Sequence, residues 1–338
     1  MRVLLAGGGG FIGSHTAIAL ASAGHSPLVV DDLSNSHKMS LERMAQLAGV
    51  DIPVLVADVR NETLVSEFLG RHGSIDAVIH LAGLKAVAES VAQPELYYGV
   101  NIGCTLAVLN LMKRHSIKNL VFSSSATVYG SSELVPHSEE SRAGIGISNP
   151  YGKTKYMIEE ILRDACAADD RLRVTALRYF NPVGAHPSGL IGENPKGTPN
   201  NLLPIVARVA TGVLDEVTVF GADYPTADGT GVRDYIHVQD VARGHVRAAE
   251  LYGSGFDAIN LGTGKPASVL DVIRAYREAS GVTIPYRTAD RRPGDVPVSF
   301  ADVAKAERLL GWRAELNLQD ACRDDWNWQQ TGAQDHLT

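Results

Sequence analysis

Short apolar runs recur along the first half of the chain, with patterns typical of helices between them. The runs are RVLLA, PLVV, PVLVA, AVIHLA, NLVFS and RVTALR, at residues 2–6, 27–30, 53–57, 77–82, 119–123 and 173–178. Each run is hydrophobic throughout rather than alternating, which indicates a strand covered on both faces. The pattern therefore predicts repeated β-α-β units and an α/β fold whose parallel sheet lies between two layers of helices.

The regular alternation of strand and helix patterns becomes weaker after residue 180. A stretch rich in glycine, proline and asparagine, residues 186–201, is followed by short mixed elements up to the end of the chain. We therefore expect a first domain over residues 1–180 and a smaller C-terminal α/β domain over residues 181–338. Segments near 235–260 are candidates to return to the first domain.

Composition narrows the function classes. The chain has 338 residues, enough for two domains, and its 45% hydrophobic and 20% charged residues are typical of a globular protein. The formal charge of -7 gives no general attraction to nucleic acid or to an anionic membrane, so an anionic ligand needs a few local arginines. Three cysteines form no CxxC pair and no zinc-type cluster. We expect no metal and a reducing, cytoplasmic location.

One alternative concerns the beginning of the chain. Residues 3–30 contain no charged side chain other than histidine, and Ala21-Ser22-Ala23 resembles a signal-peptidase site. Six glycines, two histidines and a proline interrupt that run, so a continuous apolar region is missing. The same residues make a better strand, loop and helix.

A glycine-rich turn follows the first apolar run. Gly7, Gly10 and Gly13 are spaced by three, ahead of a helical pattern that reaches about residue 23. Such a turn brings bare backbone and a helix N-terminus to a pyrophosphate, and Asp31 at the end of the second run would accept hydrogen bonds from ribose hydroxyls. In this context the motif predicts a Rossmann-type, doubly wound sheet that binds NAD rather than NADP. Taken alone, it also fits an ordinary turn.

Asp58 ends the third apolar run, and two roles are open for it. At the end of a strand it is placed to meet the adenine of a dinucleotide. It is equally placed to cap the helix expected over residues 61–70.

A second group of reactive side chains follows the fifth run. Three serines occupy residues 123–125, and Tyr151 and Lys155 lie four residues apart in a helix that we expect to begin with Asn149 as N-cap and Pro150 at its first position. The ammonium of Lys155 should lower the pKa of Tyr151, which suits a general base. The alternative is an ordinary amphipathic helix in which the tyrosine packs and the lysine is solvated.

Longer stretches carry a family resemblance over nearly the whole chain. They include HLAGLKAVAESV at 80–91, SSSATVYG at 123–130, PYGKTK at 150–155, RYFNPVGAHPSG at 178–189, PNNL at 199–202, DYPTADGTGVRDYIHV at 223–238 and RRPGDVP at 291–297. With these motifs the chain resembles the extended short-chain dehydrogenase/reductase superfamily and, within it, the UDP-glucose 4-epimerase family of galactose metabolism. The resemblance implies an isomerase that works as a homodimer, through helices near residues 94–115 and 150–168.

The resemblance also implies the roles of individual residues. Tyr151 matches the base of the family, Lys155 its assisting lysine and Ser125 its serine. The positions that match NAD contacts are Gly7, Gly10, Phe11, Ile12, Gly13, Asp31, Asn35, Ser36, Asp58, Val59, Ala82, Lys85, Asn101 and Tyr179. The positions that match contacts to the UDP-sugar are Asn181, Asn201, Leu202, Phe220, Arg233, Arg292, Asp295 and Ser299.

The implied reaction inverts C4 of UDP-glucose and UDP-galactose. NAD stays bound and takes a hydride from C4 while Tyr151 removes the proton of the 4-hydroxyl, either directly or through Ser125. The 4-keto sugar turns over, held by its UDP, and the hydride returns to the opposite face. Arg233 and Arg292 carry forked donors that suit the diphosphate, and Asp295 suits ribose hydroxyls.

Two positions depart from the family pattern. Ser299 takes the place of a large aromatic beside the 2-substituent of the sugar, which predicts room for UDP-GlcNAc and UDP-GalNAc unless Phe300 fills that space. Residues 101–105 replace the usual VNGT-like run, and Asn101 is still expected at a helix start that faces the cofactor. We expect Cys104 to be a buried residue without chemistry.

Competing functions are tested by the same residues. A nucleotide-sugar dehydratase or lyase of this superfamily needs an acid and a base after the serine, where this chain has Ala126 and Thr127. A non-catalytic NAD(H)-sensing protein should have lost the tyrosine or the lysine, and both are present. His237 and the three tryptophans, at residues 312, 326 and 328, are expected to be structural.

Overall fold

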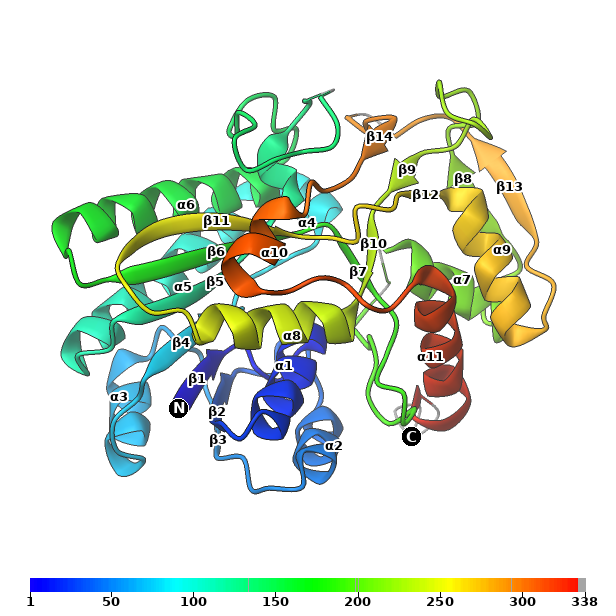
Figure 1. The fold of residues 1–338 in the computed structure, drawn as a ribbon. Helices are drawn as coiled ribbons and strands as arrows, with labels where there is room; N and C mark the ends of the chain where they lie inside the picture. Colours follow the sequence, from blue (N-terminus) through cyan, green and yellow to red (C-terminus); the bar gives the residue numbers. More distant parts are fainter. Residues whose placement is uncertain (133, 198, 200, 293, 334–338) are drawn as a thin grey trace.

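The computed structural model describes residues 1–132, 134–197, 199, 201–292 and 294–333. A parallel seven-stranded sheet has the order β11-β6-β5-β4-β1-β2-β3 and forms the larger part of the molecule (Figure 1). Its strands are β1 (Arg2–Ala6), β2 (Ser26–Asp31), β3 (Val54–Val56), β4 (Ala77–His80), β5 (Asn119–Ser125), β6 (Arg173–Tyr179) and β11 (Gly255–Leu261). The strand order reverses between β1 and β4, as in Rossmann-type sheets, where ligands bind at the carboxyl ends of the strands. The predicted fold class is confirmed.

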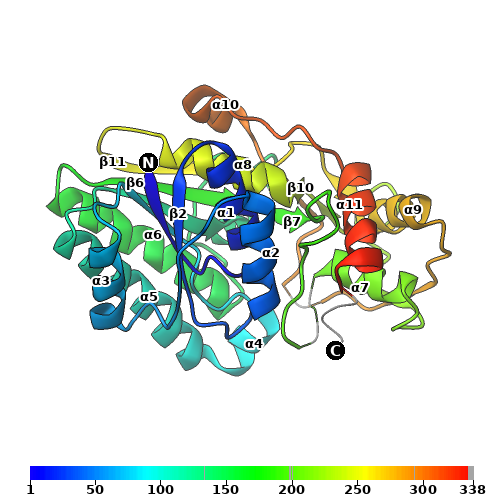
Figure 2. The same cartoon turned by 90° about the horizontal axis from the view of Figure 1, so that it is seen from below.

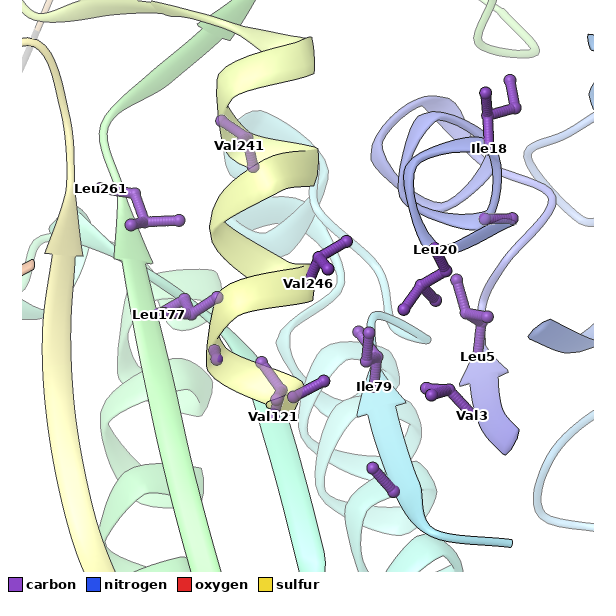
Figure 3. Packing of buried hydrophobic residues seen from close by; sticks show 14 of the residues in the cluster. Val3, Leu5, Ile18, Leu20, Ile79, Val121, Leu177, Val241, Val246 and Leu261 are labelled. Atoms are coloured by element: carbon purple, nitrogen blue, oxygen red, sulfur yellow. The ribbon is translucent and has the colours of Figure 1, made fainter. Parts of the chain in front are cut away.

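Helices cover both faces of this sheet, which explains its continuous apolar runs. One apolar layer joins alternate strand residues to α1 (Phe11–Ser22), α2 (Lys38–Ala48), α8 (Val238–Ala249) and α10 (Ala304–Leu310). Figure 3 shows side chains of this layer from α1, α8 and five of the strands. The other layer joins the remaining strand residues to α3 (Glu62–Arg71), α5 (Pro94–Arg114) and α6 (Pro150–Ala168). The short α4 (Val87–Ala92) and the 3-10 turn η1 (Ala126–Tyr129) lie close to α6.

A smaller unit lies beyond the carboxyl ends of the strands (Figure 2). It has a core of its own, formed largely by α7 (Leu202–Ala210), α9 (Val269–Ser280), α11 (Leu318–Thr331) and β8 (Val217–Phe220), with β8 paired to β13 (Tyr286–Ala289). Two further small sheets lie between this unit and the large sheet: β7 (Asn181–Val183) with β10 (Tyr235–His237), and β9 (Val232–Arg233) with β12 (Ala267–Ser268) and β14 (Val298–Ser299).

Of the residues expected to be structural, His237, Trp312 and Trp328 are buried, and Trp326 is half-buried. His237 accepts the first-turn amide of Gln239 at 3.1 Å and lies 3.3 Å from Asp324, so it caps α8. Trp328 of α11 is buried, and the indole of Trp312 donates to the carbonyl of Asp240 at 3.1 Å. Among the described residues, no helix combines the length and hydrophobicity needed to span a membrane.

Candidate active site

The glycine-rich turn joins β1 to α1 at the reversal of strand order. Gly7 has a φ of +84°, and a Cβ there would lie 2.5 Å from the backbone nitrogen of Ala82, after β4. A Cβ on Gly13 would lie 2.5 Å from the carbonyl oxygen of Gly7, so close backbone packing requires both glycines. A Cβ on Gly10 would meet only that same oxygen, at 3.9 Å. The protein itself therefore leaves an open approach at Gly10.

That opening lies at the N-terminus of α1. Gly10 is the N-cap residue and caps without a side chain, and the first turn, which begins with Phe11 and Ile12, carries no acidic residue. The free amides and the positive end of the helix dipole therefore suit a phosphate group. These residues fit the pyrophosphate of a dinucleotide.

Asp31 ties the end of β2 to this turn. Its carboxylate is buried and accepts hydrogen bonds from the amide of Gly9 at 2.8 Å, the amide of Leu33 at 2.9 Å and the hydroxyl of Ser36 at 2.7 Å. These three donors hold the carboxylate beside the glycine turn. This arrangement fits a ribose with free hydroxyls and disfavours one that carries a 2'-phosphate.

Asp58 does not cap α3. Asn61 is the N-cap, and its side chain accepts the amide of Leu64 at 3.3 Å. The capping alternative for Asp58 is therefore wrong, because Asp58 is paired instead with Arg60. The guanidinium of Arg60 donates to both carboxylate oxygens at 2.5–3.0 Å and holds the pKa of Asp58 below its usual value. The neighbouring Val59 is buried.

A loop residue that the sequence analysis did not single out connects the two groups of predicted contacts. The carboxylate of Glu193 accepts from the ammonium of Lys85 at 2.8 Å and from the side-chain amide of Asn201 at 3.1 Å, and its side chain is only 6% exposed. Three residues further on, the amide of Lys196 donates to the side chain of Asn35 at 3.1 Å. In the sequence, Glu193 could have been noticed as an acidic residue within a loop rich in glycine and proline.

The catalytic candidates meet where β5 ends and α6 begins. The side chain of Asn149 accepts the amide of Gly152 at 2.8 Å, with Pro150 at the first helical position, so the predicted helix start is confirmed. The ammonium of Lys155 donates to the carbonyl of Ser123 at 2.6 Å and lies 5.8 Å from the centre of the Tyr151 ring. Ser125 lies close enough to Tyr151 to lower the pKa of its phenol, and the hydroxyl of Ser125 accepts the amide of Thr127 at 3.2 Å.

Burial sets the proton affinities here, and one expectation is wrong. Desolvation raises the pKa of Tyr151, and the hydrogen bond with Ser125 only opposes this effect. Lys155 does not produce the predicted lowering, because desolvation dominates the pKa of Tyr151, and burial lowers the pKa of Lys155 itself to about 8. At pH 7 the lysine therefore still carries a proton, while the protein groups alone favour a neutral phenol.

Two other predicted cofactor residues lie on either side of the catalytic pair. Asn101 is buried in the second turn of α5 and not at a helix start, because α5 already begins at Pro94. Its side chain bonds the backbone of Leu84 at 2.7 and 3.1 Å and the hydroxyl of Thr154 at 3.0 Å, which joins the turn after β4 to α6. Tyr179, at the end of β6, is buried with its hydroxyl 3.2 Å from His245, and burial raises its pKa.

Four predicted substrate residues form two contacting pairs, and one member of each pair lies on the loop between β13 and β14. The guanidinium of Arg292 stacks 4.0 Å above the centre of the Phe220 ring, and Arg233 lies 3.9 Å from the carboxylate of Asp295. The amide of Asp295 donates to the carbonyl of Arg292 at 3.2 Å, which links the two pairs. Two cations, an aromatic ring and a carboxylate can bind a diphosphate, a base and ribose hydroxyls.

The remaining predicted substrate residues surround this cluster. Ser299 of β14 lies in register with Arg233 of β9. Asn181 begins β7, beside Tyr235 of β10, and Leu202 is the first residue of α7. In the part of the chain that the structure describes, no group of three or more His, Cys, Asp or Glu side chains is arranged to hold a metal ion.

Comparisons with known proteins agree with this geometry. The model of the NAD dependent epimerase/dehydratase family matches residues 3–262. The UDP-glucose 4-epimerase of Bacillus subtilis is 51% identical over 98% of this chain and 97% of its own length. The crystal structure of UDP-glucose 4-epimerase from Bifidobacterium longum in complex with NAD+ and UDP has a TM-score of 0.94 at 50% identity, over 98% of this chain and 99% of that one.

A second solved structure extends the likeness over the full length. It is the UDP-glucose-4-epimerase from Stenotrophomonas maltophila with bound NAD and formylated UDP-arabinopyranose, with a TM-score of 0.95, 46% identity and full coverage of both chains. The family model covers most of the chain, and the relatives are about 50% identical to it. Together these matches establish the family of this chain. This chain belongs to the NAD dependent epimerase/dehydratase family.

Proposed function

We propose that this chain is an NAD-dependent isomerase that inverts C4 of UDP-glucose and UDP-galactose. The observation that carries the proposal is the meeting of Tyr151, Ser125 and Lys155 at the carboxyl edge of β5. A phenol, a hydroxyl that can relay a proton and an anchored ammonium form an acid/base group for an alcohol. The likeness to proteins named UDP-glucose 4-epimerase supports the substrate class.

The residues of this chain divide the reaction between proton transfer and hydride transfer. Bound at the glycine turn, NAD would supply the hydride acceptor and a positive charge near the phenol. Tyr151 takes the proton of the 4-hydroxyl, directly or through Ser125, and gives it back when the new C–H bond has formed. Lys155 stays protonated near pH 7 and stabilises the phenolate form of Tyr151, which accepts the proton in the first step and is restored when the proton is returned. The same tyrosine therefore acts as base and as acid, and no net redox change results.

Anchoring and turning of the substrate require different contacts. The forked donors of Arg233 and Arg292 suit the diphosphate, and Phe220 supplies an aromatic face. Amide side chains such as Asn181 and Asn201 offer neutral contacts to the sugar. A firm hold on UDP with a loose hold on the hexose lets either face of the 4-keto sugar meet the hydride donor.

The test uses the purified protein without added NAD+. We expect UDP-galactose to be converted to UDP-glucose and the denatured protein to release one dinucleotide per chain. Tyr151→Phe should lower turnover about 10²- to 10⁴-fold without unfolding the protein. Tyr156→Phe, on the same helix, is the matched control and should retain activity. Loss of water from the sugar would identify a lyase, and a bound dinucleotide without turnover would identify a sensor.

We propose in addition that UDP-GlcNAc and UDP-GalNAc are substrates. Support comes from the small side chain of Ser299, next to Arg233 in the register of β14 and β9. A small residue leaves volume for an N-acetyl group, and a bulky one removes it. Ser299→Tyr should lower kcat/KM for UDP-GlcNAc at least about tenfold relative to UDP-glucose. No turnover of UDP-GlcNAc by the unaltered protein, or an unchanged ratio in the variant, would refute this substrate range.

We also propose that the chain forms a homodimer through α5 and α6. Leu96 and Leu106 of α5 and Met157 of α6 are 42%, 47% and 43% exposed, and exposed apolar side chains on neighbouring helices favour an interface. Light scattering after size-exclusion chromatography should give twice the chain mass of 36.1 kDa. Leu106→Glu should shift this mass toward the monomer, whereas Leu309→Glu on α10 serves as a control elsewhere on the surface.

A further inference from the structure

Three successive serines of β5 contact three residues of the catalytic helix. The carbonyl of Ser123 accepts a hydrogen bond from the ammonium of Lys155, and Ser125 lies close enough to Tyr151 to lower its pKa. Between them, the hydroxyl of Ser124 donates to Glu159 at 2.6 Å. The helix residues are spaced by four and so share one face of α6. Glu159 is therefore the third contact of the face that carries the catalytic pair.

Glu159 is a fully buried carboxylate whose two oxygens are both bonded. The guanidinium of Arg178, on β6, donates to Oε1 at 2.9 Å and to Oε2 at 2.5 Å, and both side chains are almost inaccessible to water. Ser124 provides the third hydrogen bond. A charge inside the run RVTALR needs such a partner, because an unpaired buried charge is strongly destabilising.

The ion pair belongs to a longer buried chain of hydrogen bonds. Arg178 also donates to the hydroxyl of Tyr129 at 3.1 Å, and that hydroxyl donates to the side chain of Asn260 at 2.6 Å. The side-chain Nδ2 of Asn260 donates to the carbonyl of His137 at 2.8 Å. The chain thus connects α6, β6, η1 and β11 directly behind the catalytic residues. A buried ion pair contributes little net stability compared with apolar packing. The position of this pair behind the catalytic residues therefore points to a role other than stabilising the fold.

The charge of Glu159 also acts on Lys155. Burial lowers the pKa of Lys155, and electrostatic interactions with Cys104 and with the carboxylate of Glu159 oppose this effect. The other titratable groups facing Lys155 are Cys104 of α5, His80 of β4 and Tyr151. Burial raises the pKa of Cys104 to about 11 and lowers that of His80 to about 3, so both are neutral at pH 7. Glu159 therefore supplies the negative charge that helps to keep the lysine protonated.

We propose that Glu159 is a positioning residue of the reaction: held by Arg178 and Ser124, it fixes Lys155 and Tyr151 against β5 and provides the counter-charge of the lysine. This inference rests on the proposed function, because it assigns a task to a residue that touches neither substrate nor cofactor. It predicts that catalysis depends on the carboxylate more strongly than substrate binding does.

The test begins with Glu159→Gln. We expect kcat to fall about tenfold or more, because small displacements of catalytic groups are costly, while KM changes less than about twofold. The alkaline limb of the kcat profile should move to lower pH, because Lys155 then loses its proton more easily. Glu160→Gln is the matched control: the next residue is half exposed, pairs with Arg163 at 3.3 Å and should change neither parameter.

Two further variants separate positioning from folding. Glu159→Gln combined with Arg178→Gln removes both buried charges and should recover thermal stability, while kcat stays low and the alkaline limb stays displaced. Ser124→Ala removes one hydrogen bond and no charge, so kcat should fall a few-fold with an unchanged pH profile. A double variant with wild-type kcat and pH profile would overturn the proposal, because Glu159 would then serve the fold alone.

A readout without turnover keeps the two proposals distinguishable. The titration of Lys155 can be followed by the NMR signal of its Cε, assigned by its loss in Lys155→Met. We expect a lower midpoint in Glu159→Gln than in the unaltered protein and in Glu160→Gln. If the unaltered protein fails to convert UDP-galactose, the proposed function is wrong, and the titration still decides whether Glu159 is the counter-charge. Equal midpoints in all three proteins would refute that role.

Discussion

The two ends of the candidate site are constructed in different ways. At the edge of the large sheet, the glycine turn is fixed by backbone atoms in close approach, and Lys155 is held beside Tyr151 by a buried hydrogen bond. At the other end, Arg233 lies on a two-residue strand and forms a half-buried ion pair. Arg292 lies on a loop and stacks on an aromatic ring. At the first end, the closely packed glycines serve folding as well as binding, whereas the residues of the second end can be changed with little effect on the fold.

The largest expected effect is that of Gly7→Ala on stability. The new Cβ would lie 2.5 Å from the nitrogen of Ala82 at a φ of +84°, so strain and overpacking should cost about 3 kcal/mol or more of the free energy of unfolding. Urea denaturation measures this change. Gly10→Ala is the comparison, because its Cβ has space and the φ of Gly10 is -75°.

Gly10→Ala should separate binding from folding. We expect its free energy of unfolding to stay within about 1 kcal/mol of the unaltered protein. The amount of dinucleotide that copurifies should nevertheless fall, because the methyl group occupies the approach to the helix N-terminus. Equal destabilisation by the two substitutions would contradict the difference in packing between these glycines.

The second prediction concerns Asp325, a buried acid in the smaller unit. Burial raises its pKa to about 7, although the hydroxyl of Tyr276 donates to it at 2.7 Å. The unfolded chain releases this proton near pH 4 and the folded chain near pH 7. The folded state therefore binds more protons across this window, and stability falls as the pH rises.

Unfolding curves of the protein and of Asp325→Asn between pH 4 and pH 8 measure this effect. The free energy of unfolding of the unaltered protein should decrease relative to that of the variant, by at most about 1.4 kcal/mol per pH unit. The relative decrease should end above pH 7. A constant difference between the two proteins would show that Asp325 titrates alike in the folded and unfolded states.

The sequence predicted most of the large sheet, because strands covered on both faces are apolar throughout. The seventh strand was not among the apolar runs, since GFDAINL begins with glycine and carries Asp257 and Asn260. Their polar groups are satisfied by partners far along the chain: Arg173 at 3.0 Å from Asp257, and Tyr129 at 2.6 Å from Asn260. The sequence of the strand alone therefore does not show that its polar residues are paired.

The site was predictable to the extent that chemistry follows from spacing. Spacing placed Tyr151 and Lys155 on one face of α6, and the N-cap rule gave the start of that helix. The direction of the Tyr151 pKa was predicted wrongly, because burial by elements distant in sequence outweighs one nearby cation. Glu159 and Glu193 were missed for the same reason: only the fold shows which cations they face.

The third prediction tests the exposed end of the site. Arg292→Ala removes one forked donor, and a hydrogen bond between charged groups contributes about 1.5–3 kcal/mol, so KM for UDP-galactose should rise roughly 10- to 100-fold. Stability should change little, because the Phe220 stack lies at the surface. Arg287→Ala on β13 removes an equally exposed arginine, paired with Glu216 at 2.8 Å, and should leave KM unchanged. An equal rise of KM in both variants would indicate a general effect of charge.

The smallest expected effect separates two neighbouring acceptors at the start of α3. Asn61→Ala should lower the free energy of unfolding by about 1 kcal/mol, because the amide of Leu64 loses its cap. Asp58→Asn should cost less, since its pair with Arg60 is largely exposed and such pairs contribute little. If Asp58 contacts a dinucleotide, its substitution lowers cofactor retention while that of Asn61 does not. A larger loss of stability for Asp58→Asn than for Asn61→Ala would contradict this assignment and indicate that Asp58 caps α3.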